Sequence, residues 1–285
     1  MRFSVRVSRH RAALAGCALA LLAPGMARAA NQPCDYGQFV LTLPPGKIDQ
    51  RADQPQPLPP PPAPGSPQAD PVVHAAIRAE VARQIREDPA MLCRYRAADL
   101  SVHAASVVFM GDSHTEFWPD GDPALFGKTV IGRGIVGQTM AQMLLRFRQD
   151  VINLHPRAVH ILAGTNDLGA VPADVQAAKD NLHTMVDLAR AHHIAVIIGT
   201  LPPPNTIGDH PADIVARTDA FNAWLKTLAA QEHLALADYS QVLRKDDGTY
   251  HLELSMDGTH PNRTGYAAMR PILTEALHAA GVTLP

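Results

Sequence analysis

From residue 104 onward, short apolar stretches alternate with longer stretches in which apolar residues recur at helical spacing. The short stretches are candidate strands, and they occupy residues 105–112, 128–134, 157–167, 193–204 and 234–240. The longer stretches are candidate helices, and they occupy residues 140–149, 173–192, 213–231 and 262–280. Strands that are apolar on both sides and alternate with helices indicate a parallel sheet covered by helices. We therefore predict an α/β fold, a three-layer α/β/α sandwich with a central five-stranded parallel sheet.

The amino-acid composition of the sequence before this region changes several times, and these changes divide the chain into segments. Residues 54–72 are rich in proline and are expected to form an extended polyproline II spacer. Apolar residues recur from Val73 to Ile85 and predict a helix up to about Glu87. Asp88-Pro89 is expected to be the cap and first turn of a second short helix, which carries residues 91–93. The predicted order is a signal peptide (residues 1–29), an N-terminal segment (30–53), a proline-rich linker (54–72), a helical extension (73–100) and the main domain (101–285).

The first residues have the pattern of a secretory signal peptide. Arginines near the N-terminus precede an apolar run at residues 12–23, and the small-x-small sequence "ARA" ends at Ala29. The apolar run is shorter than a helix needs to span a membrane. We therefore expect cleavage after Ala29, export to the periplasm or medium, and no stable membrane insertion after cleavage. The alternative is a lipoprotein, because "LAGC" resembles a bacterial lipobox, although too few apolar residues precede Cys17 for that signal.

Cleavage at this position would change the net charge of the protein. Residues 1–29 contain five arginines and no acidic residue, so their removal from 25 basic and 27 acidic residues leaves 20 against 27, a formal net charge of −7. Binding to nucleic-acid phosphates needs clustered positive charge. We therefore expect no nucleic-acid partner.

Two cysteines, Cys34 and Cys93, remain after the expected cleavage. Disulfides form in exported proteins, so a bond between these two residues is the favoured interpretation, and two buried thiols are the alternative. The sequence contains neither "HExxH" nor "CxxC", and we expect no metal site.

Polar residues follow the candidate strands, where parallel α/β sheets place their ligand sites. "GDSHTEFW" after the first strand contains Ser113, and "GTND" after the third contains Asn166. "MDGTHPN", which follows the fifth strand and a loop, contains Asp257 and His260. A serine, a carboxylate and a histidine are the groups of a nucleophilic hydrolase, although each motif alone could be an ordinary turn or helix cap. The loop at residues 201–210, after the fourth strand, is expected to help form the pocket.

The stretch "GRGIVGQT" at residues 132–139, after the second strand, fits three kinds of site. It matches the G-x-G-x-x-G pattern of dinucleotide sites and differs from a phosphate loop by Gln138 in place of the lysine. A dinucleotide site needs an acidic residue at the end of the next strand, but Asp150 falls before that strand, and Gln138 cannot supply the charge of a lysine. The third interpretation is a glycine turn whose backbone N–H groups face a ligand that is not a nucleotide.

In their order along the chain, these blocks resemble those of the SGNH or GDSL hydrolases. The resemblance is carried by Ser113 in "GDS", Gly137 in "GIVGQT", Asn166 in "GTND" and His260 in "DGTHP", and it covers about residues 104–280. It implies the flavodoxin-like fold of that family and a serine esterase that uses no cofactor. It also favours the third interpretation of the glycine-rich stretch, with its N–H groups facing an oxyanion.

The resemblance assigns roles to individual residues. Ser113 is expected to be the nucleophile, activated by His260, which Asp257 holds in the right tautomer. The N–H groups of Ser113 and Gly137 and the amide of Asn166 are expected to form the oxyanion hole. Contacts with the substrate are expected from four residues near these motifs: His114, Trp118, Val136 and Asp167. Many members of the family carry an apolar residue at the position of His114, so the pocket beside the nucleophile is expected to differ.

The expected function is hydrolysis of a small acyl carboxylic ester, with acetyl as one option, by an exported enzyme acting on a small-molecule substrate. Acyl transfer to another hydroxyl and lysophospholipase-type hydrolysis remain as alternatives, and so does a binding module that has lost turnover. The complete set of triad and oxyanion residues favours catalysis over the binding module. The acyl chain length and the alcohol part of the substrate do not follow from the sequence.

Overall fold

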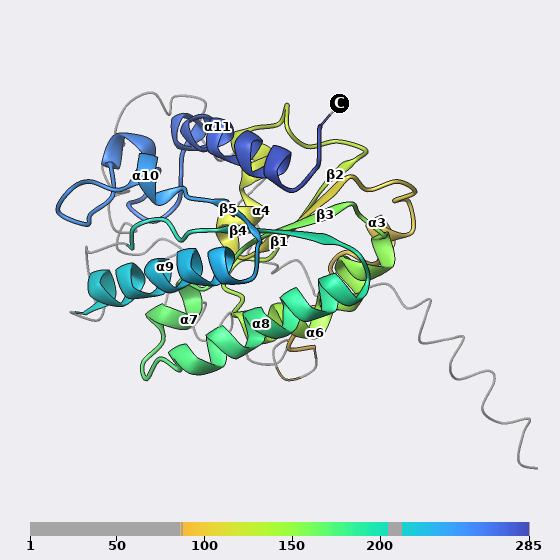
Figure 1. Ribbon diagram of the computed structural model, residues 1–285, viewed down its shortest axis with the longest axis horizontal. Coiled ribbons are helices and arrows are strands. Elements are labelled where there is room, and N and C mark those ends of the chain that lie inside the picture. Colours follow the sequence, from red (N-terminus) through yellow and green to blue (C-terminus); the bar gives the residue numbers. More distant parts are fainter. Residues whose placement is uncertain (1–85, 87, 205–212, 285) are drawn as a thin grey trace, which may run out of the picture. The chain divides into compact units, whose positions relative to one another are not determined.

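A central parallel sheet lies between two layers of helices in the computed structural model, which describes residues 86, 88–204 and 213–284 (Figure 1). The sheet has five strands in the order β2-β1-β3-β4-β5, and all neighbouring strands are parallel. Their bounds are β1 Val107–Gly111, β2 Val130–Gly134, β3 Ala158–Leu162, β4 Ala195–Gly199 and β5 Ala235–Ala237. The predicted fold class is therefore confirmed, and each strand lies within the stretch predicted for it.

Long helices cover both faces of this sheet. Their bounds are α6 Met140–Asp150, α8 Val175–Ala191, α9 Ile214–Gln231 and α11 Arg263–Ala279. Helices α6, α8 and α9 lie on one face and α11 on the other (Figure 1). Shorter elements have too few residues to show a helical period, and the sequence pattern does not predict them. They are α3 Arg96–Asp99, α4 Ser113–Glu116, α5 Trp118–Gly121, η3 Ile152–Leu154, α7 Thr165–Gly169, α10 Ser240–Leu243 and η4 Leu252–Leu254.

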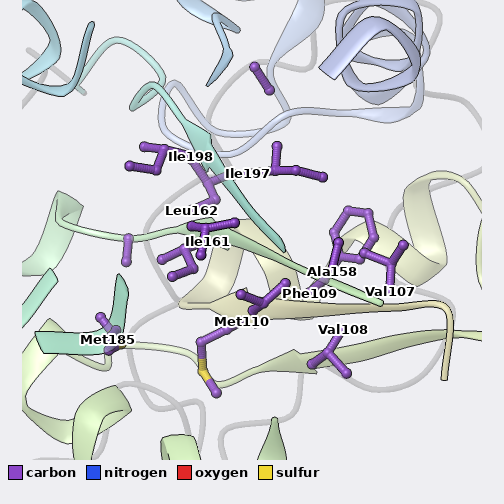
Figure 2. Close-up of a cluster of buried hydrophobic side chains, with 14 of the residues drawn as sticks. Val107, Val108, Phe109, Met110, Ala158, Ile161, Leu162, Met185, Ile197 and Ile198 are labelled. Carbon is purple, nitrogen blue, oxygen red and sulfur yellow. The ribbon is translucent and has the colours of Figure 1, made fainter. Parts of the chain in front are cut away.

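The two strands at the centre of the sheet, β1 and β3, are buried at every position, because helices cover both of their faces. Their apolar side chains, with those of Ile197 and Ile198 from β4, form the middle of the hydrophobic core (Figure 2). His160 of β3 is also fully buried, which lowers its pKa to about 3, and its Nε2 lies 2.8 Å from the Tyr239 hydroxyl. This histidine is part of the core.

The segment before β1 differs from the prediction. The prediction of a short helix that begins at Asp88-Pro89 and carries residues 91–93 is wrong. Residues 89–90 and 92–95 form turns, and Met91 has a φ of 52°, in the left-handed region that interrupts a helix. The Asp88 carboxylate accepts the N–H of Cys93 at 3.2 Å. Cys93 is disulfide-bonded, and the second cysteine of that bond lies outside the described residues, so its pairing with Cys34 stays a prediction.

Several other predictions concern parts of the chain that the structure does not describe. They are the signal peptide, the N-terminal segment at residues 30–53, the proline-rich linker and most of the helical extension. In the part that is described, none of the helices has both the length and the apolar character needed to cross a lipid bilayer.

Candidate active site

Ser113 occupies the tight turn between strand β1 and helix α4. The strand ends at Gly111, Asp112 caps the helix, and Ser113 is its first residue, which puts it at the carboxyl edge of the sheet. A Cβ at Gly111 would lie 2.1 Å from Thr115 Oγ1 and 2.4 Å from the carbonyl oxygen of Leu162. Glycine is therefore required at the first position of "GDS", because this turn leaves no room for a side chain.

A chain of short hydrogen bonds runs from Ser113 to Asp257. The Ser113 hydroxyl lies 2.8 Å from His260 Nε2, and His260 Nδ1 lies 2.7 Å from Asp257 Oδ2. The other carboxylate oxygen accepts the backbone N–H groups of Thr259 and His260 at 2.9 and 2.8 Å. Burial raises the pKa of Asp257, but the hydrogen bonds and charge of His260 outweigh burial, and the pKa is lowered overall. An ionised Asp257 keeps the proton on Nδ1, which leaves Nε2 free to accept the serine proton.

Asp112 contacts a different histidine, His114. Asp112 Oδ1 accepts the backbone N–H of His114 at 3.0 Å and lies 3.0 Å from its ring Nδ1. The ring Nε2 lies 3.1 Å from the carbonyl oxygen of Thr259. Burial opposes the protonation of His114, but the Asp112 carboxylate outweighs burial, and the pKa of His114 is raised. Because both ring nitrogens face acceptors, His114 connects the turn that carries Ser113 to the turn that carries His260.

Gly137, in the loop after β2, and Asn166, in the short helix α7 after β3, both follow strands at the carboxyl edge of the sheet. Gly137 is exposed between β2 and α6, and its φ of 77° is one that residues with a side chain rarely adopt. Asn166, in α7, donates its amide N–H to the carbonyl oxygen of Gln138 at 3.0 Å. The same amide nitrogen makes a longer contact, of 3.5 Å, with Asp112 Oδ2, which is too long for a strong hydrogen bond.

A cavity of about 420 Å³ opens beside these two residues. Its described lining consists of Gly137, Thr139, Thr165, Asn166, Gly169, Ala170, Leu201, Pro202, Pro204, Ile214, Thr218 and Thr259. The loop after β4 contributes Leu201, Pro202 and Pro204, as the sequence predicts, and residues 205–210 of that loop lie outside the described part of the chain. Within the described residues, no cluster of three or more His, Cys, Asp or Glu side chains is arranged to hold a metal ion.

Two of the four predicted substrate contacts are wrong. Trp118 is fully buried, and its ring packs against Phe109 at 5.4 Å and Tyr266 at 5.3 Å between centroids. The His114 side chain is also buried between Asp112 and Thr259. Both residues are close to Ser113 in sequence, but the short helices after β1 direct their side chains into the protein.

Val136 and Asp167 are half-buried, and neither belongs to the described lining of the cavity. The Val136 N–H donates to Glu116 Oε2 at 2.6 Å. Both oxygens of Asp167 lie near the N–H of Met140, at 3.2 and 3.1 Å, where α6 begins. Burial raises the pKa of Asp167 to about 6. These contacts support the loop and the helix around the site, and a role in substrate binding stays a prediction.

The sequence pattern gave no sign of the residues that hold the loop carrying Gly137. The side chain of Gln138 donates to the carbonyl oxygen of Ala90 at 2.9 Å and accepts from Arg146 Nε at 2.6 Å. Arg146 is fully buried and pairs with Asp150 at 2.9 Å. The spacing of this pair along α6 is visible in the sequence, but such i, i+4 pairs usually lie on a solvent-exposed helix face. Gln138, at the position of the phosphate-loop lysine, therefore makes structural contacts inside the protein.

The chain is similar to known acylhydrolases in sequence and in structure. The sequence model of the GDSL-like lipase/acylhydrolase family matches residues 109–268, and none of the curated proteins matches the chain. Similar solved structures include a GDSL-like lipase from Bacteroides thetaiotaomicron, with 32% identity, coverage of 67% of this chain and 98% of that chain, and a TM-score of 0.63. A Bacteroides fragilis protein described as a candidate acylhydrolase has 36% identity, coverage of 66% and 96%, and a TM-score of 0.62. A Streptococcus pneumonia protein with 23% identity, coverage of 72% and 99%, and a TM-score of 0.59 shares the fold.

Proposed function

Because the chain belongs to the GDSL-like lipase/acylhydrolase family, we propose that it is a serine esterase that hydrolyses a small acyl carboxylic ester. The observation that carries the proposal is the hydrogen-bonded series of Ser113, His260 and Asp257, with links of 2.8 and 2.7 Å. A serine hydroxyl is a weak nucleophile until an adjacent base removes its proton. The series supplies that base and a carboxylate to orient it.

In the proposed reaction, Ser113 Oγ attacks the carbonyl carbon of the ester while His260 Nε2 takes the hydroxyl proton. The N–H groups of Ser113 and Gly137 and the Asn166 amide stabilise the oxyanion that forms. The bond to the alcohol oxygen then breaks, and His260 gives its proton to that oxygen, which leaves an acyl-enzyme. Water attacks the acyl carbon as His260 takes a proton from it, and the second intermediate releases the acid and returns the proton to Ser113.

The described lining of the cavity favours a small substrate. Its volume of about 420 Å³ lies toward the lower end of small-molecule sites, which span roughly 300–1,000 Å³. Gly169 and Ala170 contribute little bulk, and threonine hydroxyls offer hydrogen bonds to a polar alcohol part. This combination supports a short acyl group such as acetyl.

Export of the enzyme is part of the proposal, and it rests on the charged, apolar and small-residue regions of residues 1–29. The N-terminus of the exported protein is expected at Ala30. Edman sequencing or N-terminal peptide mass mapping of protein from the periplasm or medium tests this expectation. A mature protein that begins with a lipidated Cys17 would contradict it.

Turnover of p-nitrophenyl esters of rising acyl length, beside acetylated saccharides, tests the proposed activity. The wild-type enzyme is expected to prefer short acyl groups, and Ser113→Ala is expected to lower kcat by about 10⁴-fold or more. An added acceptor alcohol distinguishes hydrolysis from transfer, because a transferase would make the new ester at the expense of free acid. Wild-type turnover by Ser113→Ala would contradict the proposal.

A further inference from the structure

Residues 88–99, here called the bracing segment, precede the region that matches the family, residues 109–268. The segment nevertheless contacts the loop that carries Gly137. The Tyr95 hydroxyl donates to the carbonyl oxygen of Gly134, at the start of that loop. The guanidinium of Arg133 lies 4.7 Å from the centre of the Tyr95 ring and donates to Asp99 at 2.6 Å. The bracing segment is therefore anchored along the end of β2.

Both neighbours of Gly137 are connected to the bracing segment. On one side, the N–H of Val136 donates to Glu116 Oε2 at 2.6 Å, and Glu116 Oε1 accepts from Arg94 at 2.6 Å. On the other side, the side-chain amide of Gln138 donates to the carbonyl oxygen of Ala90 at 2.9 Å. The loop is therefore fixed immediately before and immediately after its glycine.

Gly137 itself has little to hold it in place. It is exposed, and among the described residues a Cβ built on it would meet no atom within 4 Å. Glycine also has a wider range of allowed backbone angles than other residues. The direction of its N–H therefore depends on the conformations of Val136 and Gln138.

The ion pair between Arg94 and Glu116 is well shielded, with side-chain exposures of 17% and 14%. Burial raises the pKa of Glu116, and the charge of Arg94 opposes that rise. Hydrogen bonds to a charged carboxylate are shorter and stronger than those between neutral groups. The Arg94 guanidinium thus favours the charged form of Glu116, which accepts the Val136 N–H more strongly than the neutral form.

We propose that the bracing segment is a positioning element of the oxyanion hole, acting on Gly137 through Arg94 and Glu116 on one side and through Ala90 and Gln138 on the other. The inference rests on the proposed function and extends it to a segment outside the family region. An N–H held in a fixed direction points toward the charge that develops in the transition state. Loss of that orientation therefore lowers kcat more than it changes KM.

Arg94→Met tests the first connection, because it keeps most of the side-chain length and removes the charge. We expect kcat to fall by about 10- to 100-fold with KM within about threefold of wild type, the size of effect that follows from a misplaced catalytic group. Arg94→Lys restores the charge and is expected to recover most of the lost kcat. The affinity of a boronic acid inhibitor, which forms a tetrahedral adduct with the serine, is expected to fall in proportion to kcat/KM.

Gln138→Glu tests the second connection independently. It keeps an oxygen that accepts from Arg146 and removes the N–H that donates to Ala90. Its expected effects on kcat and on boronic acid affinity are in the same direction as those of Arg94→Met.

Gln149→Ala is the matched control, because it also removes an amide that donates to the bracing segment, at the Leu92 carbonyl oxygen, 2.5 Å away. Gln149 is on the last turn of α6, away from Gly137. We expect it to lower the unfolding temperature as Arg94→Met does while kcat stays within about twofold of wild type.

The inference is overturned if Arg94→Met and Gln138→Glu keep kcat and boronic acid affinity within about twofold of wild type, or if Gln149→Ala lowers kcat as much as they do. Wild-type enzyme that hydrolyses no ester would instead contradict the proposed function. An active wild type with unaffected variants contradicts the positioning role alone.

Discussion

At the scale of single residues, Asp112 is next to Ser113 in sequence and Asp257 is three residues before His260, but the two aspartates make different hydrogen bonds. Asp257 lies 2.7 Å from the Nδ1 atom of His260. Asp112 contacts the backbone and ring of His114 and caps α4. Only Asp257 of this pair has the geometry to orient the proposed base, and Asp112 has the geometry to hold the nucleophile turn.

Asp257→Asn is therefore expected to lower kcat by up to about 10⁴-fold, because an amide favours the wrong tautomer of His260. The pH profile of kcat/KM should change as well, because the proposed base loses the carboxylate that orients it. Asp112→Asn should act through folding or through the position of Ser113 and should leave that profile unchanged. The assignment is reversed if Asp112→Asn changes the profile while Asp257→Asn keeps the activity and the profile of the wild type.

Asp167 is expected to link stability to pH. Its pKa is about 6 in the folded protein and about 3.9 when unfolded. The folded state therefore holds this proton more tightly, so the stabilising contribution is complete below about pH 4 and is lost as the pH rises to about 6. Asp167→Asn cannot ionise, and its free energy of unfolding should exceed that of the wild type by an amount that grows over this window, to at most about 3 kcal/mol.

Denaturant unfolding of both proteins between pH 4 and pH 8 measures this difference. A gap between variant and wild type that stays constant with pH would show that Asp167 titrates as it does in the unfolded chain.

At the scale of secondary-structure elements, the sequence predicts the parts whose periodicity extends over many residues. The strands of the sheet and helices α6, α8, α9 and α11 lie where the apolar pattern puts them, because burial on two faces or on one face leaves a repeating signal. The turns at residues 92–95 and the short helices α4 and α5 leave no such signal. For that reason the sequence did not reveal that the side chains of His114 and Trp118 face the interior.

Trp118, in α5, joins this short helix to the sheet and to α11. Its indole is fully buried against Phe109 of β1, Tyr266 of α11, and Tyr239, which precedes α10. Trp118→Ala is expected to lower the free energy of unfolding by about 3–5 kcal/mol, the usual loss for a large aromatic core residue. The KM of the folded fraction should stay near that of the wild type, because the indole does not line the cavity. A raised KM with unchanged stability would restore Trp118 as a substrate contact.

At the scale of the whole molecule, the sheet brings together residues that are far apart in the chain. Ser113 and His260 are separated by 147 positions. The proximity of these two residues could be predicted, because the polar residues that follow parallel strands lie at the same edge of the sheet. The contacts of Arg94, Gln138 and Ala90 could not be predicted. A side chain that binds a carboxylate or a backbone carbonyl group elsewhere in the chain leaves no periodic or spacing signal in the sequence.

The central claim is that Ser113 forms the covalent acyl-enzyme, and mass spectrometry of the labelled enzyme tests it most directly. The intact wild-type protein is treated with diethyl p-nitrophenyl phosphate, which transfers a phosphoryl group to an activated serine, and is then digested and mapped. We expect loss of esterase activity in step with one added group per molecule, located on Ser113, and no label on His260→Ala, which lacks the base. Complete inactivation with the label on another residue, or full activity with Ser113 modified, would contradict the account.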